Sequence, residues 1–180
     1  IIERKKNHIQ YLTEQIKAVE KQIKNKVYED EVLKSKIQNV CTIIGVGFIT
    51  AVTIVGETNG FLLFKSISQL VSYSGYDVVQ NQSGQHTGKT KISKKGNSHI
   101  RRALYFPALS AVSNCKMFHD FYLRIYENSS IKMKGYVAVQ RKLLVLIYTL
   151  FKNDTVFDPN YLKNKELEEL EEQQTVLAPL

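Results

Sequence analysis

The sequence predicts a mainly α-helical protein. Apolar residues recur at helical spacings of three and four along several segments, and the one long polar stretch with repeated glycines is confined to residues 77–97. Hydrophobic residues make up 43% of the 180 positions, which is ordinary for a chain that folds around a core. We therefore expect an N-terminal coiled-coil helix, then a compact helical domain with an irregular loop or short β-hairpin.

The first segment, residues 1–34, is expected to be the coiled-coil helix. Its apolar residues follow the three-four spacing of seam positions; they are Ile2, Ile9, Leu12, Ile16, Val19 and Ile23. The wide polar face favours a coiled coil, between chains or within one, over a helix packed on its own domain. We expect a homo-oligomer through this helix. Because the chain starts at Ile1 without a capping residue, we also expect it to be a fragment that lacks upstream residues.

The compact domain is expected to span residues 35–159 and to contain a turn between two helices at Gly45 and Gly47. Two glycines one residue apart allow a sharp turn with exposed amides, and the next helix directs its positive end toward that turn. The pattern resembles a helix-hairpin-helix element, in which hairpin amides hold DNA phosphates without reading sequence. Gly45 and Gly47 are thus candidate DNA contacts. A helix–helix corner without a ligand is the alternative.

A helix of about Ser66 to Tyr73 is expected next, with Gly75 as its C-terminal stop. Residues 77–97 are polar, contain several glycines and are too β-prone for a helix, so they predict an irregular loop or short hairpin. A loop of this length inside a compact domain is commonly functional or disordered.

Asn97 or Ser98 is expected to cap the helix that follows, and Pro107 should kink it. Later helices are expected at about residues 120–127 and 133–151, the last being rich in leucine and central to the core.

Positive charge is concentrated around the polar loop. The net charge is +8, and no carboxylate occurs between Asp77 and Asp120. The basic residues in this interval are Lys89, Lys91, Lys94, Lys95, Arg101, Arg102 and Lys116. Arginine binds phosphate in a bidentate manner and lysine acts as a point charge. The segment from Ser83 to Arg102 therefore predicts a surface that binds the backbone of double-stranded DNA.

Composition also excludes several classes. The chain has no apolar run of membrane-spanning length and its first residues do not form a secretory signal, so we expect a cytoplasmic protein without a membrane partner. Cys41 and Cys115 lack the spacing of a zinc site or disulfide scaffold, and both are expected to be reduced. The acidic run near residues 165–172 predicts a disordered tail over residues 160–180.

Several ordered motifs together resemble a known family of DNA recombination proteins. They are Ile44–Gly47 with Thr50–Ala51, Leu70–Gly75, Ser83–Gly84, Ile92–Asn97 with Ile100–Leu104, Val137–Leu144 and Phe157–Pro159. This arrangement resembles the C-terminal transposase domain of the Piv/MooV-type DNA invertases and the bridge-RNA-guided insertion-sequence transposases. Members of that family also carry an N-terminal RuvC-like DEDD domain.

The resemblance implies DNA strand exchange by a serine nucleophile, and the Ser–Gly match places that role on Ser83. It also implies Mg²⁺ held by carboxylates of the N-terminal domain, and we expect that domain to be missing from this chain. Near Ser83, Asp77 and Glu57 stand apart from one another, so we expect no metal site and no activity in the fragment alone. His86 is a candidate for proton transfer.

A non-catalytic alternative stays open. Ser–Gly pairs are common in turns, so Ser83 could be an ordinary loop residue in a helix-hairpin-helix module for DNA binding and dimerisation. The resemblance to bridge-RNA-guided transposases makes a guide RNA a candidate partner.

Overall fold

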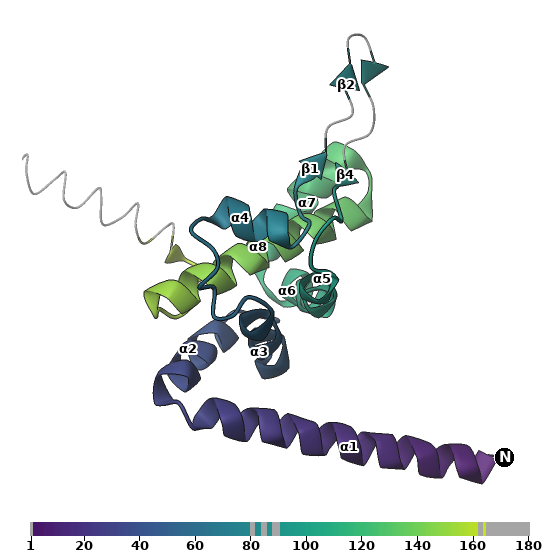
Figure 1. The fold of residues 1–180 in the computed structure, drawn as a ribbon. Coiled ribbons are helices and arrows are strands. Elements are labelled where there is room, and N and C mark those ends of the chain that lie inside the picture. Colours follow the sequence, from purple (N-terminus) through teal and green to yellow (C-terminus); the bar gives the residue numbers. More distant parts are fainter. Residues whose placement is uncertain (1, 80–81, 84–85, 88–90, 162–163, 165–180) are drawn as a thin grey trace, which may run out of the picture.

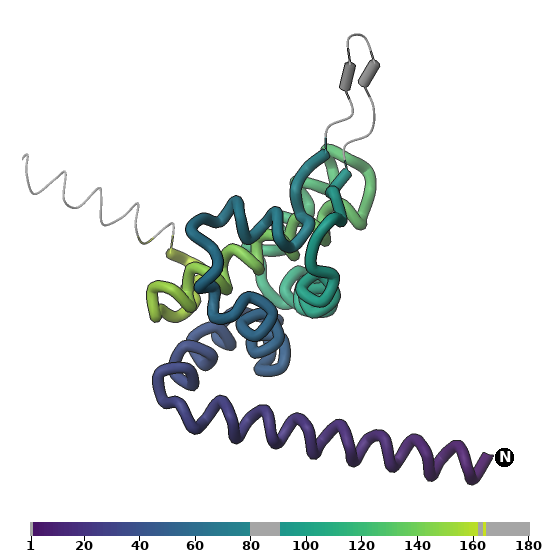
Figure 2. The backbone as a smooth tube through the Cα atoms, viewed as in Figure 1, coloured from purple at the N-terminus to yellow at the C-terminus, as the bar shows by residue number. Residues whose placement is uncertain are grey.

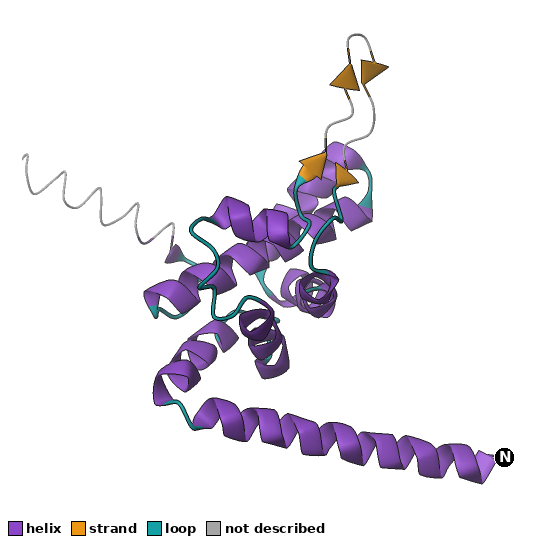
Figure 3. Ribbon diagram, viewed as in Figure 1, coloured by secondary structure: helices purple, strands orange, loops and turns teal. Residues whose placement is uncertain are grey.

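The computed structural model describes residues 2–79, 82–83, 86–87, 91–161 and 164. Helices dominate these residues, and the strands are short (Figure 3). The fold is therefore mainly helical, as the sequence predicts. None of the described helices combines the length and the apolar character needed to cross a membrane.

Helix α1 (Ile2–Tyr28) extends away from the rest of the molecule (Figure 1). Most of its predicted seam side chains are exposed, among them Ile2 by 72%, Ile9 by 64% and Ile16 by 58%, whereas Ile23 is half-buried. Val27, near its C-terminal end, is the buried residue of this helix. No described element covers the apolar stripe of α1, so the coiled coil stays a prediction.

The chain turns sharply after α1 and enters α2 (Glu31–Cys41). The Asp30 carboxylate starts this helix by accepting hydrogen bonds from the amides of Val32 (2.9 Å) and Leu33 (3.0 Å). A side-chain oxygen at this position satisfies amides that have no partner within the helix. The break lies a few residues before residue 34, where the sequence places the end of the coiled-coil segment.

Helix α3 (Phe48–Glu57) follows α2 after a short turn. Gly45 in this turn has φ +93° and lies against α6 (Tyr105–Asn114). A Cβ atom on Gly45 would lie 2.6 Å from the carbonyl oxygen of Pro107 and 2.9 Å from the amide nitrogen of Ala111. Glycine is thus required at this position by the conformation and by the approach of α6.

Helix α8 (Lys132–Asn153) is the centre of the core, as the leucine-rich pattern predicts. It buries Val139, Leu143, Leu144 and Ile147 completely or almost so. It packs against α2, α4 (Ile67–Tyr73), α6 and α7 (Lys116–Ser129). The helix α7 starts earlier than the expected residue 120, directly after Cys115.

The smooth tube of Figure 2 shows the path from α5 (Ser98–Ala103) into α6, which are separated at Leu104. The interruption lies shortly before Pro107, whose ring removes an amide donor and crowds the carbonyl of the residue four positions earlier. The predicted disturbance by Pro107 is therefore present as a break between two helices. Cys115, at the start of α7, is buried, Cys41 is half-buried, and both are free thiols.

The polar segment forms short antiparallel pairs, in agreement with the expected short hairpin. Strand β1 (Val78–Val79) pairs with β4 (Lys91–Ile92), and β2 (Gln82–Ser83) pairs with β3 (His86–Thr87). The β1–β4 pair therefore forms the base of the hairpin.

Replacing Gly45 with alanine should lower the free energy of unfolding by at least about 2 kcal/mol, because the methyl group meets the backbone of α6 in a conformation that disfavours a side chain. Urea unfolding followed by circular dichroism measures this loss. Gly56→Ala is the matched control, since a Cβ atom there has no neighbour within 4 Å. That variant should be unchanged or more stable by up to about 1 kcal/mol. Equal effects of the two substitutions would contradict the packing of Gly45 on α6.

Candidate nucleic-acid interface

Two backbone segments lie side by side at the base of the hairpin, one from Tyr73 to Asp77 and the other from Ser93 to Asn97. We call their contact the crossing. The amide of Ser93 donates to the carbonyl of Asp77 (2.8 Å), and that of Lys94 donates to Gly75 (3.1 Å). The amide of Asn97 donates to the carbonyl of Tyr73 (2.7 Å). These bonds continue the pairing of β1 with β4 down to the helices on either side.

Glycines make this crossing possible. Gly96 has φ +154°, and a Cβ atom there would collide with the carbonyl oxygen of Tyr73 and lie 2.7 Å from the amide nitrogen of Gly75. Gly75 has φ +71° and faces the backbone of Lys94 and Lys95. A larger residue at either glycine would therefore push the two segments apart.

The guanidinium group of Arg101 lies against the crossing. Its Nη1 atom donates to the carbonyls of Ser74 (2.9 Å), Gly96 (3.3 Å) and Asn97 (3.3 Å). One half-buried side chain thus joins both backbone segments of the crossing. The sequence predicts Arg101 as a DNA contact equivalent to Arg102, but the observed contacts of its Nη1 atom are internal. Its role toward DNA stays a prediction.

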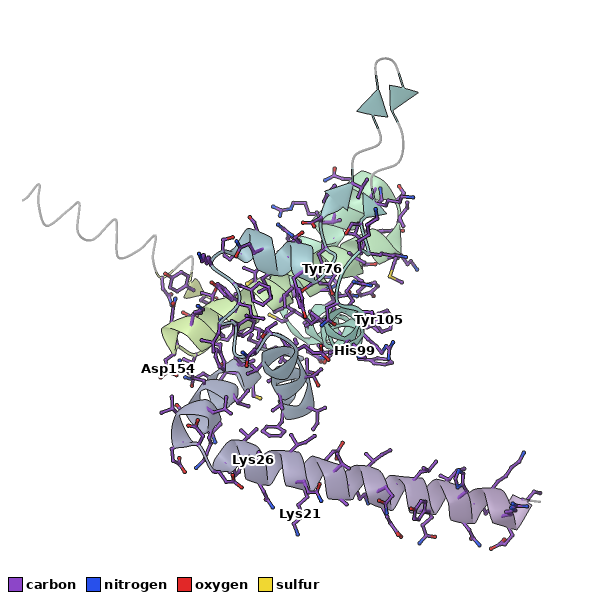
Figure 4. All side chains as sticks on the ribbon, viewed as in Figure 1. Lys21, Lys26, Tyr76, His99, Tyr105 and Asp154 are labelled. Atoms are coloured by element: carbon purple, nitrogen blue, oxygen red, sulfur yellow. The ribbon has the colours of Figure 1, made fainter. Side chains whose placement is uncertain are left out.

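Tyr76 anchors the same region to the core. Its ring is fully buried, and its hydroxyl donates a hydrogen bond to Oε1 of Gln140 on α8 (3.0 Å). Burial raises the pKa of the Tyr76 phenol well above its ordinary value, so the hydroxyl keeps its proton and acts as a donor. Figure 4 shows Tyr76 between the hairpin base and the helices below it.

Asn97 starts α5, as the sequence predicts. Its Oδ1 atom accepts hydrogen bonds from the amides of His99 (2.8 Å) and Ile100 (3.2 Å). Its Nδ2 atom donates to Oε2 of Glu57 (2.7 Å) at the end of α3. An open surface depression lies beside this contact and is lined by Ser72, Tyr73, Lys95, Gly96, Asn97, Ser98 and His99.

Exposed positive charge surrounds the crossing. Among the predicted phosphate ligands, Lys91, Lys94, Lys95 and Arg102 have exposed side chains. The salt bridges found among the described residues are Lys26–Glu29 and Lys34–Glu31, both near α2 and not at this surface. Lys89 lies outside the described residues. The basic surface, by which we mean Lys91, Lys94, Lys95 and Arg102, is thus available to an anionic partner.

Ser83 lies in β2, where the strand register places it opposite His86 in β3. The register brings the candidate nucleophile and the candidate proton carrier to one place along the hairpin. The catalytic role of Ser83 stays a prediction.

The two glycines predicted to contact DNA, Gly45 and Gly47, lie in different surroundings. Gly47 is exposed at the N-terminal cap of α3, whereas the Cα of Gly45 faces α6. The close approach of α6 therefore accounts for Gly45 without any ligand. Binding of DNA phosphates by either glycine stays a prediction.

No cluster of three or more potential metal ligands is present in the part of the chain that the structure describes. The carboxylate of Glu57 is hydrogen-bonded to Asn97, and Asp77 lies at the hairpin base. These separated carboxylates do not fit the Mg²⁺ that the resemblance implies.

Replacing Arg101 with lysine should lower the free energy of unfolding by about 1–3 kcal/mol, because a single ammonium group cannot reproduce the guanidinium contacts with carbonyls on both segments. Arg102→Lys is the control, since Arg102 is exposed and the chemical change is identical. It should alter stability by less than about 0.5 kcal/mol. Chemical denaturation of the two variants measures the difference, and equal stabilities would exclude the proposed clamping role of Arg101.

Comparisons with known proteins give concordant results. Residues 37–123 match the model of the transposase IS116/IS110/IS902 family. The chain is 25% identical over 154 residues to the pilin gene-inverting protein of Moraxella bovis, covering 84% of this chain and 48% of that protein. It is 26% identical over 157 residues to the protein of the same name from Moraxella lacunata, with the same coverage. The chain spans about half the length of these curated relatives. These matches support the assignment of this chain to a family of transposases and DNA invertases.

Proposed function

We propose that the chain is the DNA-binding part of a transposase or site-specific recombinase and that it holds duplex DNA on the basic surface at the hairpin base. The observation that carries this proposal is the exposure of Lys91, Lys94, Lys95 and Arg102 beside a rigidly held crossing. The names of the matched family and relatives support the recombination role.

The charge distribution favours a polyanion over other partners. The interval from residue 78 to residue 119 contains no carboxylate, and Glu57, which approaches it in space, is hydrogen-bonded to Asn97. Positive side chains without acidic neighbours retain their attraction for phosphate. Because hydrogen bonds hold the backbone amides of Lys94 and Lys95, less backbone freedom is lost when these residues bind.

We also propose that Ser83 is the nucleophile of the complete enzyme. Its Oγ atom attacks a DNA phosphorus and loses its proton, while the bond from phosphorus to one sugar oxygen breaks and that oxygen takes up a proton. The resulting phosphoserine diester is cleaved by a hydroxyl of another DNA end, which regenerates the serine. The exchange conserves the number of phosphodiester bonds, so no external energy source is required.

The chain's own basic residues would neutralise charge on the phosphate during both steps. We propose that the metal-binding carboxylates lie on an N-terminal domain outside this chain, which agrees with its match to about half the length of its relatives. We also propose a guide RNA as a partner of the complete protein, on the resemblance to bridge-RNA-guided transposases alone.

Neutralising Lys94 and Lys95 with glutamine should weaken binding to duplex DNA of any sequence. The slope of log K against log salt concentration should become shallower by about 2, because each phosphate contact contributes about 0.9 to that slope. Fluorescence anisotropy at several salt concentrations measures this effect. Lys17→Gln with Lys21→Gln is the control, because it removes the same charge from exposed positions on α1. An equal loss in both pairs would show that only net charge matters.

Changing Ser83 to alanine in the full-length protein should abolish strand transfer and leave duplex affinity unchanged, since the hydroxyl is proposed to act in chemistry and not in binding. Denaturing electrophoresis of protein bound to labelled DNA should detect a covalent adduct with the unchanged protein and none with the variant. Strand transfer by the Ser83→Ala variant would disprove the catalytic assignment.

The second candidate is a non-catalytic module for DNA binding and self-association. The exposed stripe of α1 favours it, because apolar seam residues at this spacing stabilise a helix only when a partner covers them. The covalent adduct distinguishes the two candidates. A serine-dependent adduct supports the recombinase, and DNA binding without any adduct in the full-length protein supports the module.

A further inference from the structure

One face of α5 and α6 carries an exposed stripe that has no role in the core. Although the helices are separated at Leu104, the amide of Leu104 donates to Ile100 (3.1 Å) and that of Ala108 donates to Leu104 (3.1 Å), so the helical path continues through the break. Ser98, Tyr105 and Asn114 are exposed on these helices. Five further exposed residues recur at spacings of three and four; they are His99, Arg102, Phe106, Ser110 and Ser113. This spacing places them on one side of the helical path.

Phe106 is the unusual member of this stripe. Its side chain is 74% exposed, although a phenyl ring gains most when it is removed from water. Tyr105 meets it edge-on, with ring centroids 5.3 Å apart and an interplanar angle of 79°. This contact restricts the Phe106 ring and leaves much of it open to a ligand.

The chemistry around the ring favours a nucleotide over a protein surface. Arg102 lies one helical turn before Phe106, with an expected Cβ separation of about 5–6 Å, and the other members of the stripe are polar. Tyr105 and Phe106 are the aromatic side chains that contact one another here, and two rings among polar side chains are too small for the core of a stable protein interface. A nucleotide supplies a flat base for the ring and a phosphate for the guanidinium group.

We infer that the Arg102–Phe106 stripe binds an unpaired base of the DNA, with Phe106 stacked on the base and Arg102 on the adjoining phosphate. The inference rests on the proposed DNA-binding function and extends it from duplex backbone to distorted DNA. Strand exchange requires that bases leave their original pairing, so such a contact would favour the DNA in that state.

The test compares a fully paired duplex with the same duplex carrying a central unpaired 2-aminopurine, each titrated with the 180-residue chain. The unchanged protein should quench 2-aminopurine fluorescence, as stacking on an aromatic ring does. Phe106→Ala should remove the quenching and lower affinity for the unpaired DNA by about 10-fold or more, with less than about 2-fold change on the paired duplex. Phe106→Tyr should retain both properties because it keeps the ring.

Leu62→Ala is the matched control, because Leu62 is 78% exposed on a loop away from the stripe. It should change neither affinity. The inference is overturned if Phe106→Ala binds both DNAs like the unchanged protein, if it weakens both equally, or if it alters self-association in sedimentation instead. An unchanged protein that binds neither DNA would overturn the proposed function as well, whereas normal duplex binding without any effect of Phe106 would overturn this inference alone.

Discussion

The contact of Arg101 with two backbone segments holds the base of the hairpin together. Its guanidinium group joins carbonyls from Ser74 on one segment and from Gly96 and Asn97 on the other. Gly75 and Gly96 bring these segments closer than any residue with a Cβ atom would allow. Backbone amides satisfy the carbonyls of Tyr73, Gly75 and Asp77, and the Arg101 guanidinium group donates to those of Ser74, Gly96 and Asn97. The hairpin base therefore depends on Arg101, a residue that the sequence alone predicts to contact DNA.

This constraint extends into the core and to the surface. Tyr76 lies within the crossing and joins it to Gln140 on α8, and Asn97 joins it to α5 and α3. Hydrogen bonds of the backbone amides hold Lys94 and Lys95 at this base. Preorganised charges bind phosphate with less loss of conformational entropy than lysines on a free loop. The rigid base and the exposed lysines are thus proposed to act together in binding phosphate.

The features that the sequence predicts correctly are those whose causes lie within a few residues. Asn97 caps α5 through its immediate neighbours, Pro107 follows the break at Leu104, and the leucine pattern of α8 forms the core. The sequence could not show that Arg101 has a structural role and Arg102 does not, because the two residues are adjacent and chemically identical. Only the fold brings Ser74 to one of them. Likewise, the glycine pattern predicts the turn at Gly45 but not the helix α6 packed against it, since that helix is distant in sequence.

Some candidate residues are held by contacts within the chain, whereas others are exposed and contact little of the fold. Arg101, Gly45 and Tyr76 are explained fully by contacts within the chain, so a ligand need not be invoked for them. The exposed ring of Phe106 and the apolar stripe of α1 are different, because each leaves hydrocarbon in water without stabilising the described fold. Exposure of that kind is unfavourable for the isolated chain and becomes favourable only when something covers it. The polar surroundings of Phe106 suit a nucleotide, whereas the long stripe of α1 suits another helix. Phe106 beside the basic surface and the stripe along α1 are therefore the two places where we propose that a partner binds.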